Sequence, residues 1–360
     1  MPNPIADLLA RATALRDQGR LDEAAALYRQ AAARDPKAAE PHHHLGWILA
    51  RQGDLAGAEA AYRKALALSP GAPASAAALG ALLLGQGRHA EGFALYDARH
   101  AIGRMAKPPL PFPEWQGEDL AGKRLLIWPE QGFGDQIQFA RFAPILQTRG
   151  ADVTLICLPP LARLFEASLP VRVLAAAGAV DFPDPDYWVM TCSIAGRMGL
   201  ALDAIPGAPY LRAPGPPPAL PPGFRVGLMA AGNPSHPNDA NRSLPAAEAA
   251  RLAAQLPGAV IDLRPEQTGA KDFADTADLI AGLDLVVTVD TSVAHLAGAM
   301  GKPCFVMLSA VDTDWRWLRD RPDSPWYPSA RLYRQEAPGA WAGVVDRVAA
   351  DAAVFANGRR

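Results

Sequence analysis

Small and large apolar residues in the first hundred positions follow a pattern that repeats every 34 residues. Three stretches share it, and each opens on a Gln-Gly pair: QGRLDEAAALYRQAAARDP, QGDLAGAEAAYRKALALSP and QGRHAEGFALYDARHAIG. The recurring positions are the small residues Ala12, Gly46 and Gly80, the glycines Gly19, Gly53 and Gly87, and the tyrosines Tyr28, Tyr62 and Tyr96. Small residues let two helices approach closely, and glycine permits the turn between them. The pattern predicts three helical hairpins, with Pro36 and Pro70 closing the first two.

The pattern changes after a proline-rich stretch at 107–123, which we interpret as an ordered linker anchored by Trp115. Continuous apolar runs now alternate with amphipathic segments. RLLIWP and ADVTLICLP are typical of buried parallel strands, whereas DQIQFARFAPILQTRG and LARLFEAS are typical of helices. Strand-helix-strand-helix order predicts a parallel sheet covered on both faces.

A second proline-dense stretch, 208–223, separates another unit of the same kind. Its predicted strands are FRVGLMAAG, AVIDLRP, LVVTVDT and CFVML, the last clear strand of the chain. Its predicted helices are SLPAAEAARLAAQLPG, capped by Ser243 with Pro245 near the first turn, ADTADLIAGLD, and SVAHLAGAMGKP, ended by Gly301. We therefore expect an α-helical domain at 1–106 and two Rossmann-like α/β lobes at 107–215 and 216–360 that face each other across a ligand cleft.

Composition and charge exclude several classes of partner. The formal net charge is -2 with a pI of about 6.4, so no basic field indicates nucleic acid or an anionic membrane. No apolar window is long enough to span a membrane, and the N-terminal stretch lacks the apolar core of a signal peptide. Cys157, Cys192 and Cys304 are far apart, which predicts buried free thiols and a cytoplasmic location.

The first candidate for chemistry is the turn EQGFGDQIQ. Gly132 and Gly134 free the backbone after a strand, and Asp135 stands where the next helix begins. A carboxylate there is stabilised by the positive end of the helix and can cap unpaired N–H groups, which is a purely structural explanation. Ile137 replaces the third glycine of a dinucleotide fingerprint, so NAD binding is not favoured.

The second candidate is the turn DTSVAH at the end of another strand. Asp290, Thr291 and Ser292 open a helix, so hydroxyls, amides and the helix dipole converge on one point. Such a point is an anion site, most naturally for a diphosphate. His295 lies one turn further on, where we expect it to face the same ligand, although a lone histidine is more often a core residue.

These stretches carry two resemblances. The 34-residue unit resembles the tetratricopeptide repeat, whose short solenoids hold peptides or proteins. GFGDQIQFARFAPIL, DTSVAHLAGAMGKPCFVML and DWRWLRDRPDSPWYPSARLYRQ resemble the heptosyltransferase-related (family 9-like) glycosyltransferases of the two-lobed GT-B fold. More narrowly, the chain is similar to their tetratricopeptide-bearing bacterial members, some of which modify flagellin.

The resemblance implies residue roles. Asp135 matches the general base for the acceptor hydroxyl, with Gly132, Gly134 and Gln138 on the acceptor side. Thr291 and Ser292 match the turn that holds the donor diphosphate, with serine in place of the usual glycine. On the donor side stand also Asn233, Arg242, Asp290 and His295. The implied reaction inverts the anomeric carbon and uses a nucleotide-sugar as substrate, with no cofactor and no metal.

Three further motifs have plainer explanations. DPD at 184–186 and DTD at 312–314 look like a metal-binding D-x-D, but that motif belongs to the other glycosyltransferase fold. His42, His43 and His44 fan around a helix, so we expect a solvated surface run rather than a metal site. The aromatic, basic segment WRWLRDRPDSPWYP is expected to close the second lobe by packing across it, rather than to stack on a base or sugar.

The sequence thus predicts a nucleotide-sugar-dependent glycosyltransferase whose repeats recruit a protein acceptor, with flagellin suggested by resemblance alone. Two alternatives stay open. One is a non-catalytic scaffold with a degenerate transferase domain, against which the retained Asp135 and the Asp290–His295 turn argue. The other is a transferase that acts on lipopolysaccharide core, for which deletion of the repeats would leave transfer intact.

Overall fold

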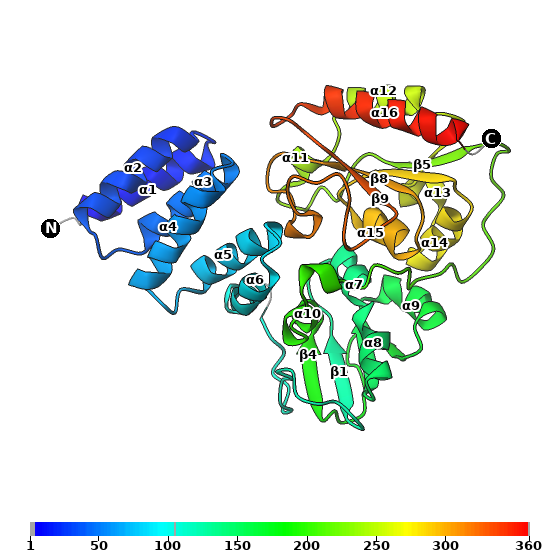
Figure 1. Cartoon of the computed structure of the whole chain (residues 1–360), viewed down its shortest axis with the longest axis horizontal. Coiled ribbons are helices and arrows are strands. Elements are labelled where there is room, and N and C mark those ends of the chain that lie inside the picture. The colour runs from blue at the N-terminus through cyan, green and yellow to red at the C-terminus, as the bar shows by residue number, and fades with distance from the viewer. Residues whose placement is uncertain (1–3, 104–105, 359–360) are drawn as a thin grey trace. The chain divides into compact units, whose positions relative to one another are not determined.

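The computed structural model describes residues 4–103 and 106–358. The chain divides into two compact units, Met1–Pro108 and Pro109–Arg360 (Figure 1). The first unit is helical, and the second holds two separate parallel sheets with their helices. The predicted class, an α-solenoid followed by α/β lobes, is confirmed.

The first unit is built of three antiparallel helical hairpins, as the 34-residue pattern predicts. The hairpins are α1 (Pro4–Asp17) with α2 (Leu21–Arg34), α3 (Glu40–Arg51) with α4 (Leu55–Leu68), and α5 (Pro73–Gly85) with α6 (His89–Tyr96), followed by a 3-10 turn, η1 (Asp97–Ala101). Gly19, Gly53 and Gly87 connect the helices of each hairpin with φ angles of 77°, 82° and 77°. A left-handed backbone of this kind favours glycine, which explains why these positions recur.

The small residues at the recurring position of Ala12, Gly46 and Gly80 allow the two helices of a hairpin to pack closely. A Cβ at Gly46 would lie 2.7 Å from the Tyr62 ring. A Cβ at Gly80 would lie 2.8 Å from the backbone nitrogen of Tyr96 and 2.9 Å from the carbonyl oxygen of Gly92. Glycine is therefore required at both places, and the predicted close approach is confirmed.

The three consecutive histidines of α3 are not the solvated run that we expected. All three are half-buried. The His44 ring stacks on Tyr28 with centroids 4.9 Å apart, and Nδ1 of His43 lies 3.1 Å from the Ser75 hydroxyl. Burial lowers the pKa of His44 to about 4, with His43 and Arg16 adding to the effect. The expectation was wrong because packing between neighbouring hairpins covers residues that a single exposed helix would leave in water.

The first lobe contains a four-stranded parallel sheet in the order β3-β2-β1-β4. Its strands are β1 (Arg124–Trp128), β2 (Asp152–Cys157), β3 (Arg172–Ala175) and β4 (Tyr187–Met190). Its helices are α7 (Phe133–Phe139), α8 (Phe142–Thr148), α9 (Ala162–Ser168) and α10 (Ile194–Arg197), with short 3-10 turns η3 (Pro159–Leu161), η4 (Thr191–Ser193) and η5 (Leu202–Ala204). The strands β3 and β4 were not predicted.

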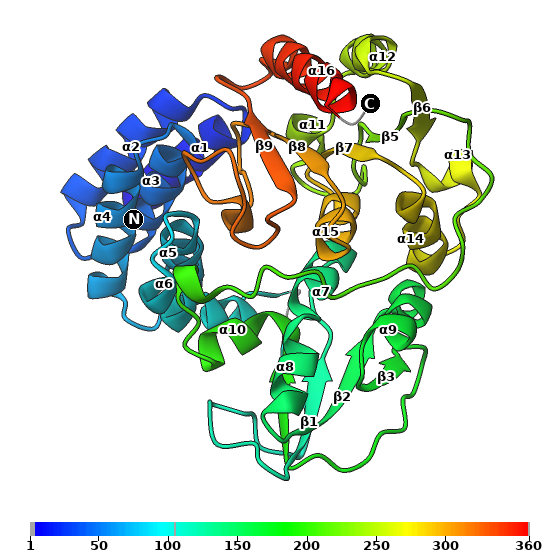
Figure 2. The same cartoon turned by 45° about the vertical axis from the view of Figure 1, so that its right-hand side comes forward.

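Helices lie on one face of this sheet, where α8 packs on β2 and α9 on β3 (Figure 2). We expected helices on both faces, but irregular segments cover the other face of this sheet. Its buried cluster is Leu126, Ile156, Trp188 and Met190, and half-buried apolar residues of irregular segments close it, among them Leu110, Phe112, Val180 and Phe182. Trp115 is buried and its N–H donates to the Trp188 carbonyl, so the predicted anchor of the linker is confirmed.

The single helix that we predicted for 135–150 is divided into α7 and α8. Side chains compete for the carbonyl groups at the break. The Tyr210 hydroxyl donates to the carbonyl of Ile137 at 2.8 Å, and Nε of Arg141 donates to the carbonyl of Gln138 at 2.8 Å. These carbonyls would otherwise accept the next backbone N–H groups of a continuous helix.

The second lobe contains a five-stranded parallel sheet in the order β6-β5-β7-β8-β9. Its strands are β5 (Arg225–Met229), β6 (Ala259–Asp262), β7 (Leu285–Val289), β8 (Cys304–Leu308) and β9 (Ala330–Arg334). Its helices are α11 (Asp239–Arg242), α12 (Ala246–Gln255), α13 (Pro265–Thr268), α14 (Phe273–Ala281), α15 (Ser292–Ala299) and α16 (Trp341–Asn357), with a 3-10 turn η6 (Trp315–Trp317). Figure 1 shows α12 and α16 on one face of the sheet and α14 and α15 on the other.

Three details of this lobe differ from the sequence prediction. Strand β9 and helix α16 follow the strand that we took as the last. Helix α12 begins at Ala246, so Ser243 is not its N-cap. Instead the Ser243 hydroxyl accepts the N–H of Gly232 and donates to Asp239, which closes the turn after β5. Gly301 does end α15 in a left-handed conformation, with a φ angle of 69°.

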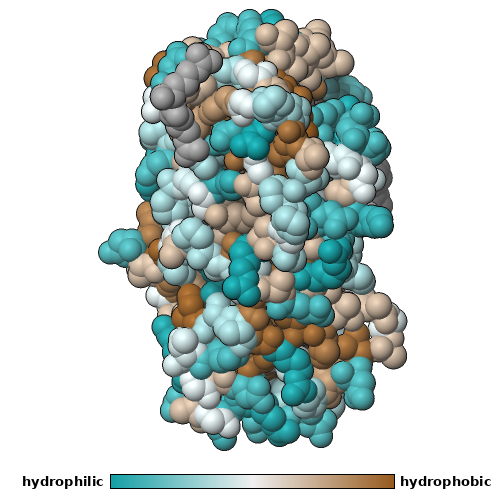
Figure 3. Space-filling view, turned by 90° about the vertical axis from the view of Figure 1, so that its right-hand side faces the viewer, coloured by the Kyte–Doolittle hydropathy of each residue, from teal (hydrophilic) through white to brown (hydrophobic). Residues whose placement is uncertain are grey.

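Within the described residues, none of the helices combines the length and the apolarity needed to cross a bilayer. The predicted free thiols are confirmed, because Cys157, Cys192 and Cys304 are each buried and unpaired with another cysteine. Figure 3 shows the face of the molecule that carries α9 and α14, where an apolar band runs among hydrophilic residues in the lower part of the view.

Candidate active site

Asp135 lies at the carboxyl end of the first sheet, in the first turn of α7. Its Oδ2 accepts the N–H of Gly132 at 2.9 Å, so the carboxylate does cap the helix. The residue before this turn, Gln131, has a φ angle of 58°. A non-glycine residue in the left-handed region is strained, and such strain tends to persist where the surrounding structure fixes a functional turn.

The other oxygen of Asp135 is bound by the second lobe. Oδ1 lies 2.6 Å from Nη2 of Arg316, which belongs to η6 after β8. Nη1 of the same guanidinium lies 2.9 Å from Oδ2 of Asp314. The Asp135 side chain keeps 20% of its surface exposed, whereas that of Arg316 keeps 3%. The two lobes therefore meet at this carboxylate.

The turn after β7 forms the second half of the site. Asp290 follows the strand, Thr291 is the N-cap of α15 and Ser292 is its first residue. The Thr291 hydroxyl lies 3.1 Å from that of Thr288. Nη1 of Arg242 donates to the Asp290 carbonyl at 3.1 Å, which brings the predicted cation to this turn.

The turn after β5 places Arg242. Its Nε donates to Asp239 at 3.1 Å, and both side chains lie against Gly232, where a Cβ would be 2.5 Å from the Asp239 carboxylate. Asn233 stands at the exposed end of the same turn, and its side-chain oxygen accepts the N–H of Ser235. Of the predicted donor-side residues, the structure thus brings Arg242, Asp290, Thr291 and Ser292 together, and leaves Asn233 at the outer end of the turn.

Buried charges set the electrostatics. Burial raises the pKa of Asp135 above its ordinary value, against the lowering influence of Arg316. Burial, together with the Asp314 carboxylate, raises the pKa of Asp290 to about 6. Burial also opposes ionisation of Asp314, but the bonds to Arg316 outweigh it and lower its pKa. Perturbed carboxylates gathered at the ends of facing strands are typical of a functional site.

Two residues predicted to lie at the ligand site, His295 and Gln138, are buried. His295 is 7% exposed; its Nδ1 lies 3.0 Å from the Tyr327 hydroxyl, and its ring stacks on Trp317 at 5.1 Å. A Cβ at Gly134 would lie 2.6 Å from Cδ2 of His295, so the absence of a side chain at Gly134 lets α7 and α15 touch. Both lobes thus cover the His295 ring in this structure, and its contact with a ligand stays a prediction.

Gln138, predicted on the acceptor side, is fully buried. Among the described residues neither of its side-chain polar atoms has a hydrogen-bond partner. The acceptor-side role of Gln138 therefore stays a prediction.

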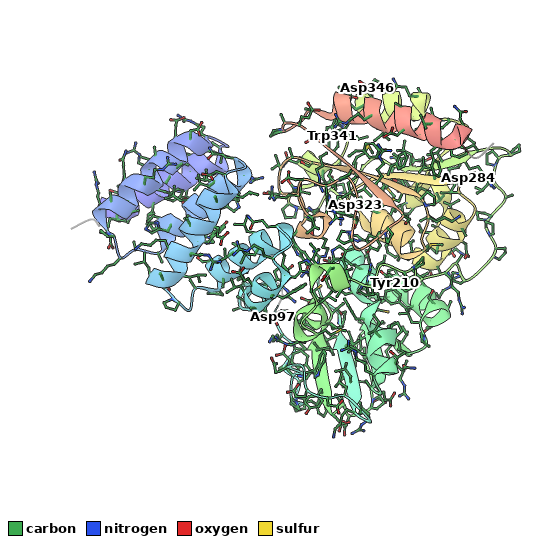
Figure 4. All side chains as sticks on the ribbon, in the orientation of Figure 1. Asp97, Tyr210, Asp284, Asp323, Trp341 and Asp346 are labelled. Carbon is green, nitrogen blue, oxygen red and sulfur yellow. The ribbon has the colours of Figure 1, made fainter. Side chains whose placement is uncertain are left out.

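The lobes are fastened beside the site by Arg141, which is fully buried. Nη1 of Arg141 donates to the carbonyls of Pro206 and Trp326, both at 2.8 Å. Its guanidinium stacks over the rings of Tyr210 and Tyr327 at 4.7 and 4.8 Å. Figure 4 shows Tyr210 between the two lobes, on the segment that connects them.

The aromatic segment at 314–327 packs against both lobes, since Trp315 and Trp326 contact Phe139 and Trp317 stacks on His295. Trp315, Trp317, Trp326 and Tyr327 are all buried. Leu318 within it has a φ angle of 56°, which is strained for a leucine. The acidic motifs are held by arginines, since Asp186 pairs with Arg124 and Asp314 with Arg316. Among the described residues no cluster of histidine, cysteine and acidic side chains has a metal-binding arrangement.

Sequence reasoning missed Arg316 as a residue of the site. The signal was present, because an arginine between two tryptophans in an aromatic segment must have a partner if it is buried. What the sequence did not supply was the partner, which is 181 positions away in the other lobe.

The fold defines a protein with two α/β lobes, whose sheets end at the turns of Asp135 and Asp290. Residues 235–312 match glycosyltransferase family 9 (heptosyltransferase), and residues 9–73 match the tetratricopeptide repeat. The family 9 match includes Arg242 and the 290–295 turn, and ends before Arg316. Two segments of the chain are thus similar to the tetratricopeptide repeat and to the family 9 glycosyltransferases.

Similar proteins include Protein FlbA of Caulobacter vibrioides, which is 29% identical over 313 residues, or 73% of this chain and 52% of FlbA. The chain spans about half the length of this curated relative. Among solved structures, MamA is 22% identical over 28% of this chain and 60% of its own, with a TM-score of 0.26. The type III secretion chaperone SycD of Yersinia enterocolitica is 18% identical over 28% of this chain and 78% of its own, also with a TM-score of 0.26.

Proposed function

We propose that this protein is an inverting glycosyltransferase, which moves a sugar from a nucleotide-sugar to an acceptor hydroxyl. The observation that carries the proposal is the position of Asp135. Its carboxylate, partly exposed, stands at the carboxyl end of the first sheet and touches the second lobe beside the turn of Asp290. A base on one lobe and an anion site on the other is the arrangement that direct displacement requires.

In the proposed reaction Asp135 takes the proton of the acceptor hydroxyl while the oxygen attacks the anomeric carbon. The bond from that carbon to the donor phosphate breaks, and its electron pair leaves with the nucleoside diphosphate. The first turn of α15 and the Arg242 guanidinium are the groups that stabilise the leaving diphosphate. Attack from the face opposite the leaving group inverts the configuration. The chemistry needs no metal and no cofactor.

The test uses a panel of nucleotide-sugars with the wild-type protein and Asp135→Asn, which keeps the size of the side chain. We expect donor turnover by the wild type, and a loss of about 10²–10⁴-fold in kcat in the variant. Donor binding, followed by the rise in melting temperature, stays close to that of the wild type because the donor contacts lie in the other lobe.

Two results would contradict the proposal. If Asp135→Asn turns over donor at the wild-type rate, Asp135 is not the base. If the wild type turns over none of the donors, the non-catalytic scaffold is favoured. The acceptor is tested with the full chain, a radiolabelled donor and a cell extract. Label in protein supports an acceptor recruited by the repeats, for which flagellin is one candidate, whereas label in lipopolysaccharide supports the alternative acceptor. The buried free cysteines are compatible with the cytoplasmic location that the sequence predicts.

A further inference from the structure

The Asp135 carboxylate is held from both lobes. Gly132, in its own turn, donates to Oδ2 at 2.9 Å, and Arg316, in the second lobe, lies 2.6 Å from Oδ1. Each carboxylate oxygen can accept two hydrogen bonds. A substrate hydroxyl can therefore donate to Asp135 without breaking either contact.

The Arg316 guanidinium is itself fixed by groups from both lobes. From the second lobe, Asp314 binds Nη1 at 2.9 Å, and the Trp315 ring lies 4.6 Å from the guanidinium carbon. From the first lobe, the Phe139 ring lies 5.3 Å from the same carbon and the Cys192 sulfur 3.8 Å from Nη2. A planar guanidinium confined in this way can hold a carboxylate in one orientation.

We propose that Arg316 is a positioning residue for glycosyl transfer, which orients the Asp135 carboxylate from the opposite lobe. The inference rests on the proposed function, because it assigns Asp135 as the base. It adds that the Asp135 carboxylate is held in one orientation only while the η6 segment, residues 314–317, is packed against α7. The donor lobe thus controls the acceptor-side base through one ion pair.

Charged and titratable groups of the described residues face Asp135 from more than one element. Arg316 and Asp314 come from the η6 segment, Glu130 comes from the turn before α7, and His236 comes from the turn after β5. Arg316 lowers the pKa of Asp135, whereas Asp314 and Glu130 raise it. Removal of the Arg316 cation should therefore raise the pKa of the base, and removal of the Asp314 charge should lower it.

The experiment compares the pH dependence of kcat and kcat/KM for donor turnover in the wild type, Arg316→Gln, Arg316→Lys and Asp314→Asn. In Arg316→Gln we expect kcat to fall at least about tenfold, and the acidic limb to move up by about one pH unit. Arg316→Lys keeps the cation, so its acidic limb stays near that of the wild type while kcat falls less. In Asp314→Asn the acidic limb moves to lower pH.

Arg321→Gln is the matched control. Arg321 lies in the same segment and pairs with the exposed Asp323, so kcat and the acidic limb should not change. Opposite shifts in Arg316→Gln and Asp314→Asn support the inference, since a structural defect would not move the two limbs in opposite directions. If Arg316→Gln does not fold, the acidic limbs of Arg316→Lys and Asp314→Asn test the positioning role.

The outcomes separate the two proposals. A wild type that turns over donor, with acidic limbs that do not move in Arg316→Gln or Asp314→Asn, overturns the positioning role and leaves the proposed function intact. A wild type that turns over no donor overturns the proposed function and the positioning role with it.

Discussion

At the scale of single residues, burial decides what each titratable group can do. Asp135 and His295 lie one on each side of the contact between α7 and α15. Asp135 keeps a partly exposed carboxylate beside a cation, so it can exchange a proton. His295 is enclosed by Gly134, Trp317 and Tyr327, and burial lowers its pKa to about 3, with the nearby Arg316 cation adding to the effect. It is neutral at every physiological pH.

The neutral state of His295 predicts an acid sensitivity of folding. Its pKa is near 6.5 in the unfolded chain and about 3 in the folded protein. As pH falls through this window the unfolded chain binds a proton that the folded protein does not, so stability is lost. Between pH 7 and pH 5 we expect His295 to contribute about 2 kcal/mol to the loss.

Urea unfolding of the wild type and His295→Asn at both pH values measures this contribution. The variant is less stable at pH 7, because the ring stacking is lost, but it should lose less stability on acidification. An equal loss in both proteins would show that His295 is not the group responsible.

At the scale of elements, the repeat unit depends on positions where a side chain has no room. Gly80 faces the backbone of α6, which cannot turn aside as a flexible side chain can. Gly46 faces the Tyr62 ring at a similar distance. The 34-residue period that made these glycines visible in the sequence is the length of one helical hairpin with its connection.

Gly80→Ala should destabilise the repeat unit by about 1–3 kcal/mol, because a Cβ would overlap the backbone of Tyr96 and Gly92. Gly71→Ala is the control, since a Cβ there meets nothing within 4 Å and the change should stay within about 0.5 kcal/mol. Thermal unfolding followed by far-UV circular dichroism compares the two. Equal melting temperatures for both variants would contradict the packing argument.

At the scale of the whole molecule, the two α/β lobes are joined by contacts of two kinds. Arg141 is a buried guanidinium that donates to carbonyls of the first lobe, the connecting segment and the second lobe. Arg163, at another contact of the lobes, is exposed and pairs with Asp272, the N-cap of α14, and with Asp275 in its first turn. The buried contact should contribute far more to stability, because its loss leaves desolvated carbonyls without a donor.

Arg141→Met should therefore lower the free energy of unfolding of the 109–360 unit by at least about 3 kcal/mol, and Arg163→Met by no more than about 1 kcal/mol. Tryptophan fluorescence reports this unit, since all tryptophans except Trp47 lie in it. If Arg163→Met lowers the free energy of unfolding as much as Arg141→Met does, this ranking of the two contacts is contradicted.

Much of the architecture was readable in the sequence because it follows from local periodicity. The 34-residue repeat, the turn glycines and the buried parallel strands each depend on residues that are neighbours in the chain. The errors fall where distant groups intervene. Tyr210, 73 positions from Ile137, helps to divide a helix that looks continuous, and Gly134 of the first lobe contacts the His295 ring.

The sequence by itself determined the repeat solenoid, the two α/β lobes and the two turns that end on Asp135 and Asp290, since backbone conformation and apolar spacing are local properties. Tertiary structure alone decided which charges meet. Arg316 reaches Asp135 across 181 positions because the lobes pack α7 against α15, and burial then sets how firmly each carboxylate holds its proton.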